Sequence, residues 1–184
     1  LVFKHIENLN YAIDLALGAF RLSLVGVQGK DLSDGNRKLT LALIWQLMRS
    51  HLVSFLASLR SARGGNHAAS DAEIVSWAND AVAASGRPTR IRDLADRSLA
   101  DSLFLIDLLA AVEPRCIDRS HVTDGASLAH KALNAKYAIS SARKLGCSIF
   151  VVWEDLVDVR PKMVLSFVAT LMAFQHAQQA TTLS

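Results

Sequence analysis

Apolar residues recur at helical spacing near the start of the chain and again over a longer stretch. Between Ile6 and Leu17 they stand at positions 6, 9, 13, 16 and 17, which predicts an amphipathic helix that ends at Gly18. A longer helix is expected from about Asn36 to Arg60. Between the two, Asp31–Gly35 is typical of a tight turn or a single helical turn.

The second half of the chain begins with a strong helix-start signal. Ser70 followed by Glu73 fits a capping box, in which each side chain accepts a hydrogen bond from the other residue's backbone. The helix behind it is expected to end at Gly86. Three more helices are predicted: Leu99–Val112, opened by a weaker capping signal at Ser98–Asp101; Leu128–Leu145, followed by Gly146; and a last helix with Pro161 in its first turn.

Two short apolar segments, Leu22–Val27 and Ile149–Val152, are the only strand-like stretches. They belong to different halves of the chain and cannot form a sheet together, so we expect extended loops there. The sequence therefore predicts an all-α fold built from helical bundles in tandem. Residues 61–69 are small and Gly-rich and predict a linker between a first domain at 1–60 and a second at 70–177.

One stretch of the chain occurs twice. Asn8–Met48 resembles Asn134–Met172, and from Asp31 and Asp155 onward the register holds without gaps at an offset of 124 residues. This offset is too long for a solenoid repeat and suits a duplicated domain. Residues common to both copies are assigned to the core: Tyr11 and Tyr137, Leu32 and Leu156, Leu47 and Leu171.

The first copy has only seven residues before Asn8, so it lacks the front half that the second copy carries. A half-domain would leave the apolar faces of the helix around Leu39–Met48 uncovered. We therefore expect Leu43 and Leu47 to be packed against the second domain, another chain or a segment outside this sequence.

Composition narrows the class of protein. Apolar residues make up 51% and charged residues 20%, as in ordinary packed proteins, and a net charge of +3 is too small to indicate nucleic-acid binding. Cys116 and Cys147 form no Cys-x-x-Cys motif and are expected to be free thiols in a reducing compartment, with a single disulfide bridge as the alternative. The longest apolar run near the end, Met163–Phe174, is shorter than the ~20 residues of a membrane span, and the first residues do not form a signal peptide. We expect a soluble intracellular protein without membrane contact.

Motifs for catalysis or cofactor binding fail on inspection. Gly26–Asp31 departs from the phosphate-loop pattern, and Asp31–Gly35 lacks the ligand spacing of a calcium loop. The six histidines are scattered, without metal-ligand spacing. We therefore expect no enzymatic activity, no catalytic residues, no cofactor and no metal.

Two charged groups receive structural interpretations. Asp101 is expected to be an acid in the first turn of its helix and Asp107 a residue at the rim. Four arginines lie close together between two helices and are interleaved with acidic residues, which favours a solvated loop over contact with an acidic partner: Arg87, Arg90, Arg92 and Arg97.

Several segments, in order, resemble calponin-homology domains. Asp31–Arg49 resembles the last helix of the first domain in tandem actin-binding pairs, 74–79 the first helix of the fold, and Ser98–Pro114 its central helix. Residues 133–146 and 152–172 resemble the remaining core helices of the calponin-homology fold. The similarity is greatest to the C-terminal actin-binding domain of the fimbrin (plastin) family, as the back half of a third repeat and a complete fourth repeat. Trp153 departs from the family, which usually has proline at that position.

This resemblance implies binding to F-actin, bundling of filaments when two such pairs share one protein, packing between tandem repeats and a place in the cytoplasmic actin cytoskeleton. It places filament contacts on the last helix of the first domain and at the start of the second: Arg37, Lys38, Thr40, Gln46, Arg49, His51, Asp71, Ile74 and Val75. The alternative is a calponin-homology scaffold that binds microtubules or signalling proteins, which unpaired domains often do. Trp77 is expected to anchor the core.

The two copies differ on the helix that carries most of these residues. Arg37, Gln46 and Arg49 of the first copy correspond to proline, threonine and alanine in the second. Lys38 has a lysine counterpart and is equally explained by the fold. Because the bias toward longer and basic side chains belongs to the first copy alone, these positions are where an acidic partner is expected to bind.

Overall fold

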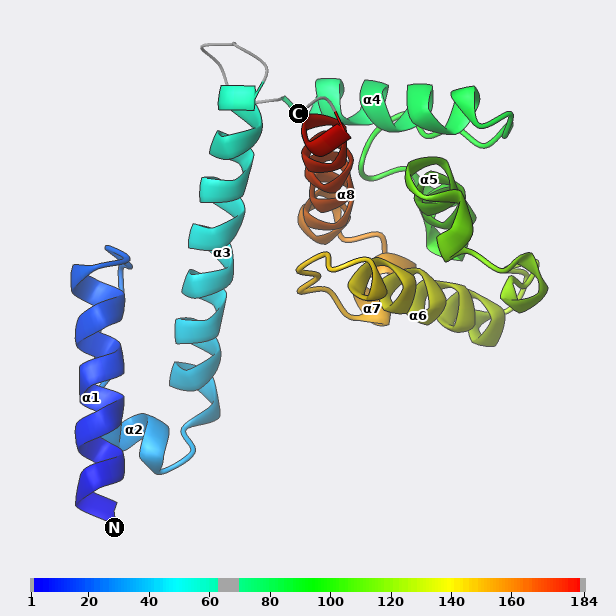
Figure 1. The fold of residues 1–184 in the computed structure, drawn as a ribbon. Helices are drawn as coiled ribbons and strands as arrows, with labels where there is room; N and C mark the ends of the chain where they lie inside the picture. Colours follow the sequence, from blue (N-terminus) through cyan, green and yellow to red (C-terminus); the bar gives the residue numbers. More distant parts are fainter. Residues whose placement is uncertain (1, 63–69, 183–184) are drawn as a thin grey trace. The chain divides into compact units, whose positions relative to one another are not determined.

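The computed structural model describes residues 2–62 and 70–182; for residue 49 and for 52–62 and 180–182 it describes the backbone only. Every regular element in this described part is helical, which confirms the all-α prediction (Figure 1). Leu22–Val27 and Ile149–Val152 form no strand. The chain divides into two compact units, Leu1–Ala57 and Ser58–Ser184. The predicted linker lies outside the described residues apart from positions 61 and 62, which continue the preceding helix.

The first unit contains α1 (Val2–Gly18), α2 (Gly29–Ser33) and all but the last five residues of α3 (Arg37–Ala62). The single helical turn α2 packs closely on α1, and Gly29 makes this approach possible. Its backbone N–H donates to Asn10 Oδ1 at 2.8 Å, and a Cβ at this position would lie 2.7 Å from the carbonyl oxygen of Ile6. Only glycine fits such a contact without a shift of the backbone.

The core of the first unit is thin, and three core assignments made for this copy do not hold fully. Tyr11 is 66% exposed, whereas Leu32 and Leu47 are half-buried. The physical reason is that α1 packs against a helix of a single turn, which covers one side of it and buries Ile13 and Ala16. Leu43 is also half-buried, so the expectation that something covers this face of α3 stays a prediction.

The second unit has four long helices and a shorter one: α4 (Asp71–Ala84), α5 (Leu103–Val112), α6 (Leu128–Lys144), α7 (Trp153–Val157) and α8 (Pro161–Thr182). The helix α5 is central, since it packs against α4, α6 and α8 and residues 104–109 are all buried. From α8, Phe167, Leu171 and Met172 complete this core with no exposed surface. Tyr137 is half-buried, while Leu156 and Leu171 are fully buried, as predicted for this copy.

Helix starts in the second unit follow local side-chain chemistry. The Ser70 hydroxyl accepts from the backbone N–H of Glu73 at 3.3 Å, and the Glu73 carboxylate accepts from the backbone N–H of Ser70 at 2.7 Å, which confirms the capping box. The helices α2 and α7 start alike. In each, the shared aspartate (Asp31 or Asp155) accepts from the N–H of the residue three positions earlier, at 2.9 and 3.1 Å.

The predicted start of the central helix at Leu99 is wrong. A 3₁₀ helix, η1 (Arg97–Asp101), comes first, and Ser102 then adopts a left-handed backbone with φ of +60° before α5 begins at Leu103. Two aspartates cause this division. Asp96 Oδ1 accepts from the N–H of Ser98 at 3.0 Å, and Asp101 Oδ1 accepts from the N–H of Leu103 at 2.9 Å, so each segment has its own cap.

Asp107 was expected at the rim, and the structure corrects this, since its side chain is buried in the second unit. Its carboxylate accepts from the hydroxyl of Thr89 at 2.7 Å and lies 2.7 Å from Nη2 of Arg119 and 4.0 Å from Nε of Arg87. One carboxylate on α5 therefore joins the loop after α4, which carries Arg87 and Thr89, to the segment between α5 and α6, which carries Arg119. Asp101 is the last residue of η1 and caps the start of α5 through Leu103, whereas it was expected within the first turn of the helix.

Cys116 and Cys147 are free thiols, as predicted. Burial raises the pKa of both to about 11. They therefore remain protonated at neutral pH and react slowly, because the thiolate is the nucleophilic form.

Candidate functional site

The basic residues predicted to bind a partner begin the helix α3. Arg37 and Lys38 occupy its first turn, and both side chains are exposed. Helix N-termini favour acidic residues, because the macrodipole places partial positive charge there, at about 0.3–1 kcal/mol for each charge. The second copy has Pro161 at the position of Arg37, and proline suits a first turn. Two cations here therefore oppose helix stability, which favours a role outside the fold.

The other predicted residues on α3 are placed differently. Thr40 donates its hydroxyl to the carbonyl oxygen of Asn36 at 2.8 Å and so closes the first turn. Gln46 donates to the carbonyl oxygen of Ser23 at 3.1 Å, which holds the segment between α1 and α2 against the helix. His51 is exposed. The side chain of Arg49 lies outside the described residues.

At about 100° per residue, Arg37 and Lys38 share a face with three exposed apolar side chains, whereas Gln46 points to the opposite side. Sequence reasoning missed these apolar residues: Leu41, Ile44 and Trp45. The signal was present, because α3 carries apolar residues on more than one side, as helices covered on two faces do.

The second unit shows what the equivalent helix does in a thicker bundle. Val168 and Ala169, the counterparts of Ile44 and Trp45, are fully buried on α8, which packs against α4 and α5. By contrast Lys162, the counterpart of Lys38, is exposed in its own unit. The face of α3 that carries Ile44 and Trp45 therefore corresponds to a face used for core packing in the second unit. The first turn, with Lys38 or Lys162, is exposed in both copies.

At the start of α4 the structure corrects two predicted contacts. Ile74 has no exposed surface and Val75 is also buried, on a helix that packs against α5 and α8. They belong to the core and cannot contact a partner. Asp71 is exposed in the first turn. With the exposed carboxylates of Glu73 and Asp80, it makes the accessible surface of α4 acidic, opposite in sign to the first turn of α3.

Trp77 was expected to anchor the core and is only half-buried. Its indole N–H donates to Oε1 of Gln175 on α8 at 3.0 Å, and it lines a cleft of about 380 Å³ with two carboxylates, Glu73 and Asp80. The Arg-rich loop is partly paired within itself, since Nε of Arg92 lies 3.1 Å from Oδ2 of Asp96. This contact agrees with the solvated-loop interpretation.

Among the described residues, no three side chains of the metal-binding types lie together in a way that could hold an ion. In that same part of the chain, no helix is both long and apolar enough to cross a membrane.

Comparison with known proteins gives a consistent result. The profile described as "Calponin homology (CH) domain" matches residues 2–52 and 68–177. Fimbrin-3 of Arabidopsis thaliana is 45% identical over 180 residues, which is 98% of this chain and 25% of that protein. Fimbrin of Schizosaccharomyces pombe is 46% identical over 171 residues, or 93% of this chain and 27% of that protein. Plastin-3 of Homo sapiens is 42% identical over 170 residues, or 92% and 26%.

Among solved structures, the crystal structure of the actin-crosslinking core of Schizosaccharomyces pombe fimbrin matches with a TM-score of 0.59 and 43% sequence identity. The match covers 93% of this chain and 34% of that chain. The chain thus spans about a quarter of the length of the curated relatives it matches.

Proposed function

This chain belongs to the calponin-homology family, and from that premise we propose that it is part of an F-actin-binding module in a protein that cross-links filaments. The observation that carries the proposal is the similarity, 43% identical over 93% of the chain, to the actin-crosslinking core of a fimbrin. We propose further that the module acts by binding alone, without catalysis, and that it works at the actin cytoskeleton of the cytoplasm.

The first turn of α3 is the proposed filament contact. Arg37 and Lys38 are exposed there and oppose the helix macrodipole, so their positive charge does not stabilise the helix itself. Arg49 lies eleven positions after Lys38, so helical spacing places the two within about 20° of each other around the axis of α3. Cations along one helix face attract an acidic surface and orient it, which affects the rate and register of binding more than the final affinity.

We propose that the apolar face of α3 serves packing between tandem repeats and does not contact actin. Ile44 and Trp45 are exposed in the first unit, but their counterparts are buried in the second. At the start of α4, Asp71 remains as a proposed contact and would face a basic group of the partner. The basic and acidic turns thus offer two contacts of opposite sign.

Co-sedimentation with F-actin tests this function. The double variant Arg37→Glu with Arg49→Glu is expected to bind at least about tenfold more weakly, or about 1.4 kcal/mol, with an unchanged circular dichroism spectrum. A matched control reverses two exposed charges elsewhere, Lys4→Glu with Arg115→Glu, and should bind as the unmodified chain does. Equal weakening of both double variants would show that the loss of F-actin binding reflects net charge and not the proposed contact. A folded double variant that binds normally would refute the proposed contact.

Co-sedimentation with microtubules in parallel separates the scaffold alternative from the filament-binding proposal. We expect the chain to remain in the supernatant there. Pelleting with microtubules but not with F-actin would overturn the proposed function.

A further inference from the structure

The two copies differ most sharply where the short helix meets the long one. In the first unit, Gly29 of α2 packs directly on Asn10 of α1, and the two are joined by a hydrogen bond of 2.8 Å. In the second unit the equivalent positions, defined by the aligned Asp31/Asp155 and Tyr11/Tyr137, hold Trp153 and Lys136. An indole ring takes the place of a glycine, so α7 and α6 cannot meet in the same way.

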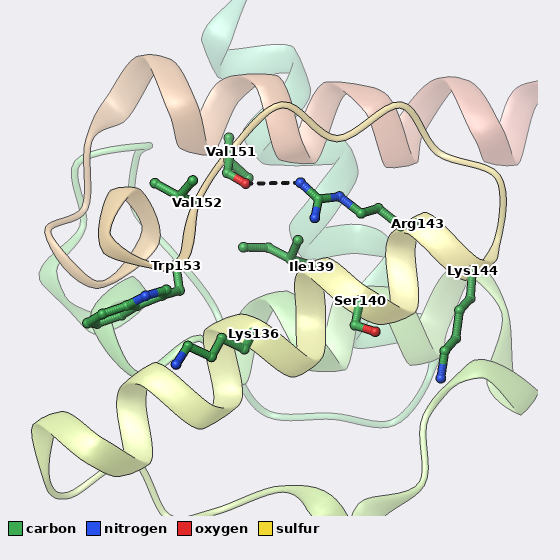
Figure 2. Close-up of a pocket in the computed structure, with 8 residues that line it drawn as sticks. All are labelled: Lys136, Ile139, Ser140, Arg143, Lys144, Val151, Val152 and Trp153. Carbon is green, nitrogen blue, oxygen red and sulfur yellow. Dashed lines mark hydrogen bonds between the residues drawn. The ribbon is translucent and has the colours of Figure 1, made fainter.

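A groove lies at this place in the second unit (Figure 2). We call it the α6 groove; its volume is about 480 Å³, within the range of ligand sites. Ile139 from α6 and Val151 from the facing segment are nearly fully buried and form its floor, whereas Val152 is half-exposed at its edge. Figure 2 shows Lys136 extending from α6 toward the ring of Trp153, and its Nζ lies 5.1 Å from the ring centroid.

The charge around this apolar floor has one sign. Lys136, Arg143 and Lys144 line the α6 groove, and among the described residues no acidic side chain lines it. Arg143 is already engaged, because its guanidinium donates to the carbonyl oxygen of Ile149 at 3.0 Å and holds the facing segment in place. Lys136 and Lys144 remain as the exposed cations of the rim.

Spacing tells which acidic ligand fits. Lys136 and Lys144 are eight residues apart on one helix, which corresponds to about 12 Å along its axis. An extended peptide covers that length with roughly four residues at ~3.3 Å each. A single small anion reaches one lysine only and leaves the apolar floor uncovered. A peptide with acidic residues on both sides of a bulky apolar side chain matches both lysines and the floor.

We propose that the α6 groove is a docking site for an acidic peptide segment, whose apolar side chain packs against Trp153 and Val151 while its carboxylates pair with Lys136 and Lys144. The site lies on α6 and α7 of the second unit and uses none of the residues assigned to filament binding. The site can therefore be tested in the absence of F-actin.

Fluorescence anisotropy tests the proposal on the whole chain without F-actin. The probe is a labelled peptide in which a leucine–phenylalanine pair is flanked on both sides by glutamates. We expect saturable binding that weakens as ionic strength rises from about 0.05 to about 0.5 M, because screening reduces the attraction between exposed charges. The same peptide with glutamines in place of glutamates should bind at least tenfold more weakly. Equal binding of the two peptides would overturn the charge assignment.

Three variants locate the site. Lys136→Glu with Lys144→Glu should weaken binding of the acidic peptide at least tenfold, whereas Lys131→Glu, on another face of α6, should leave it within about twofold. Lys136→Asn with Trp153→Gly restores the residues of the first copy and should abolish binding by closing the groove. Circular dichroism and urea unfolding establish that each variant is folded. Unchanged binding by either folded double variant would overturn the site.

Inorganic phosphate and vesicles containing an anionic phospholipid serve as competitors. Neither should displace the peptide at concentrations that leave ionic strength constant. Displacement by vesicles at low lipid concentration would overturn the peptide assignment in favour of a membrane surface, and displacement by phosphate would reduce the site to an anion contact.

Discussion

Replacing Asn134 by alanine tests whether one buried amide holds the loops of the second unit in place. The side chain has no exposed surface and uses its whole hydrogen-bonding capacity. Its amide N–H groups donate to the carbonyl oxygens of Asp101 at 3.0 Å and Thr123 at 3.1 Å. Its oxygen accepts from the backbone N–H of Thr123 at 2.9 Å and from the hydroxyl of the same residue at 3.0 Å.

The magnitude follows from the groups that alanine leaves without a partner. Three backbone groups, one on Asp101 and two on Thr123, lose the amide, and an unsatisfied buried group costs about 1–3 kcal/mol. These groups are only partly buried, so the lower end applies to each. We therefore expect Asn134→Ala to lower the free energy of unfolding of the second unit by about 3 kcal/mol.

Urea unfolding followed by tryptophan fluorescence measures this loss. In a Trp45→Phe background the two remaining tryptophans, Trp77 and Trp153, both report on the second unit. Leu133→Ala is the matched control, because Leu133 is adjacent on the same helix and 53% exposed; its effect should stay within about 0.5 kcal/mol. A loss below about 1 kcal/mol for Asn134→Ala, or one no larger than the control's, would refute the reasoning.

Three further variants test other contacts. Gly29→Ala places a Cβ 2.5 Å from Oδ1 of Asn10, and hydrogen exchange should show α2 released from α1 at a cost of about 1–3 kcal/mol. Asp107→Ala should cost about 2 kcal/mol in urea unfolding, below the value for a fully buried pair because Arg119 is partly exposed. Hydrogen bonds from backbone N–H groups hold the pKa of Asp96 well below its usual range. Its stabilisation relative to Asp96→Asn should be complete at neutral pH and shrink as pH falls below about 4, where the unfolded carboxylate first binds protons.

Local signals predicted the helix starts that depend on neighbouring residues alone. The capping box at Ser70 needs only Glu73, and both are within one turn. The predicted start of α5 at Leu99 was wrong, because Asp96 and Asp101 each cap a separate segment and Ser98 caps neither. The choice among three closely spaced capping residues depends on how the chain must turn to bury Leu99, which no local pattern reveals.

Local sequence patterns also predicted the surroundings of some candidate residues and not of others. Ile74 could have been assigned to the core from sequence, because it shares a helical stripe with Ala78 and Val82, and all three are buried. The burial of Asp107 could not have been predicted, because its partners Thr89, in a loop, and Arg119, at the start of a short 3₁₀ helix, lie on segments whose paths depend on the packed bundle. A lone carboxylate in an apolar helix looks like a rim residue until those loops are placed.

The duplication turns each copy into a reference for the other. Where both copies expose a position, as at Lys38 and Lys162, a substitution tests binding; where one copy buries it, as Val168 does for Ile44, a substitution tests packing. The same logic applies to the α6 groove, which lies where the second unit has Trp153 and the first unit has the closely packed Gly29. The shared fold does not require this difference, in which one copy has a close helix contact and the other has a groove at the same place. Function is therefore expected where the copies diverge at exposed positions.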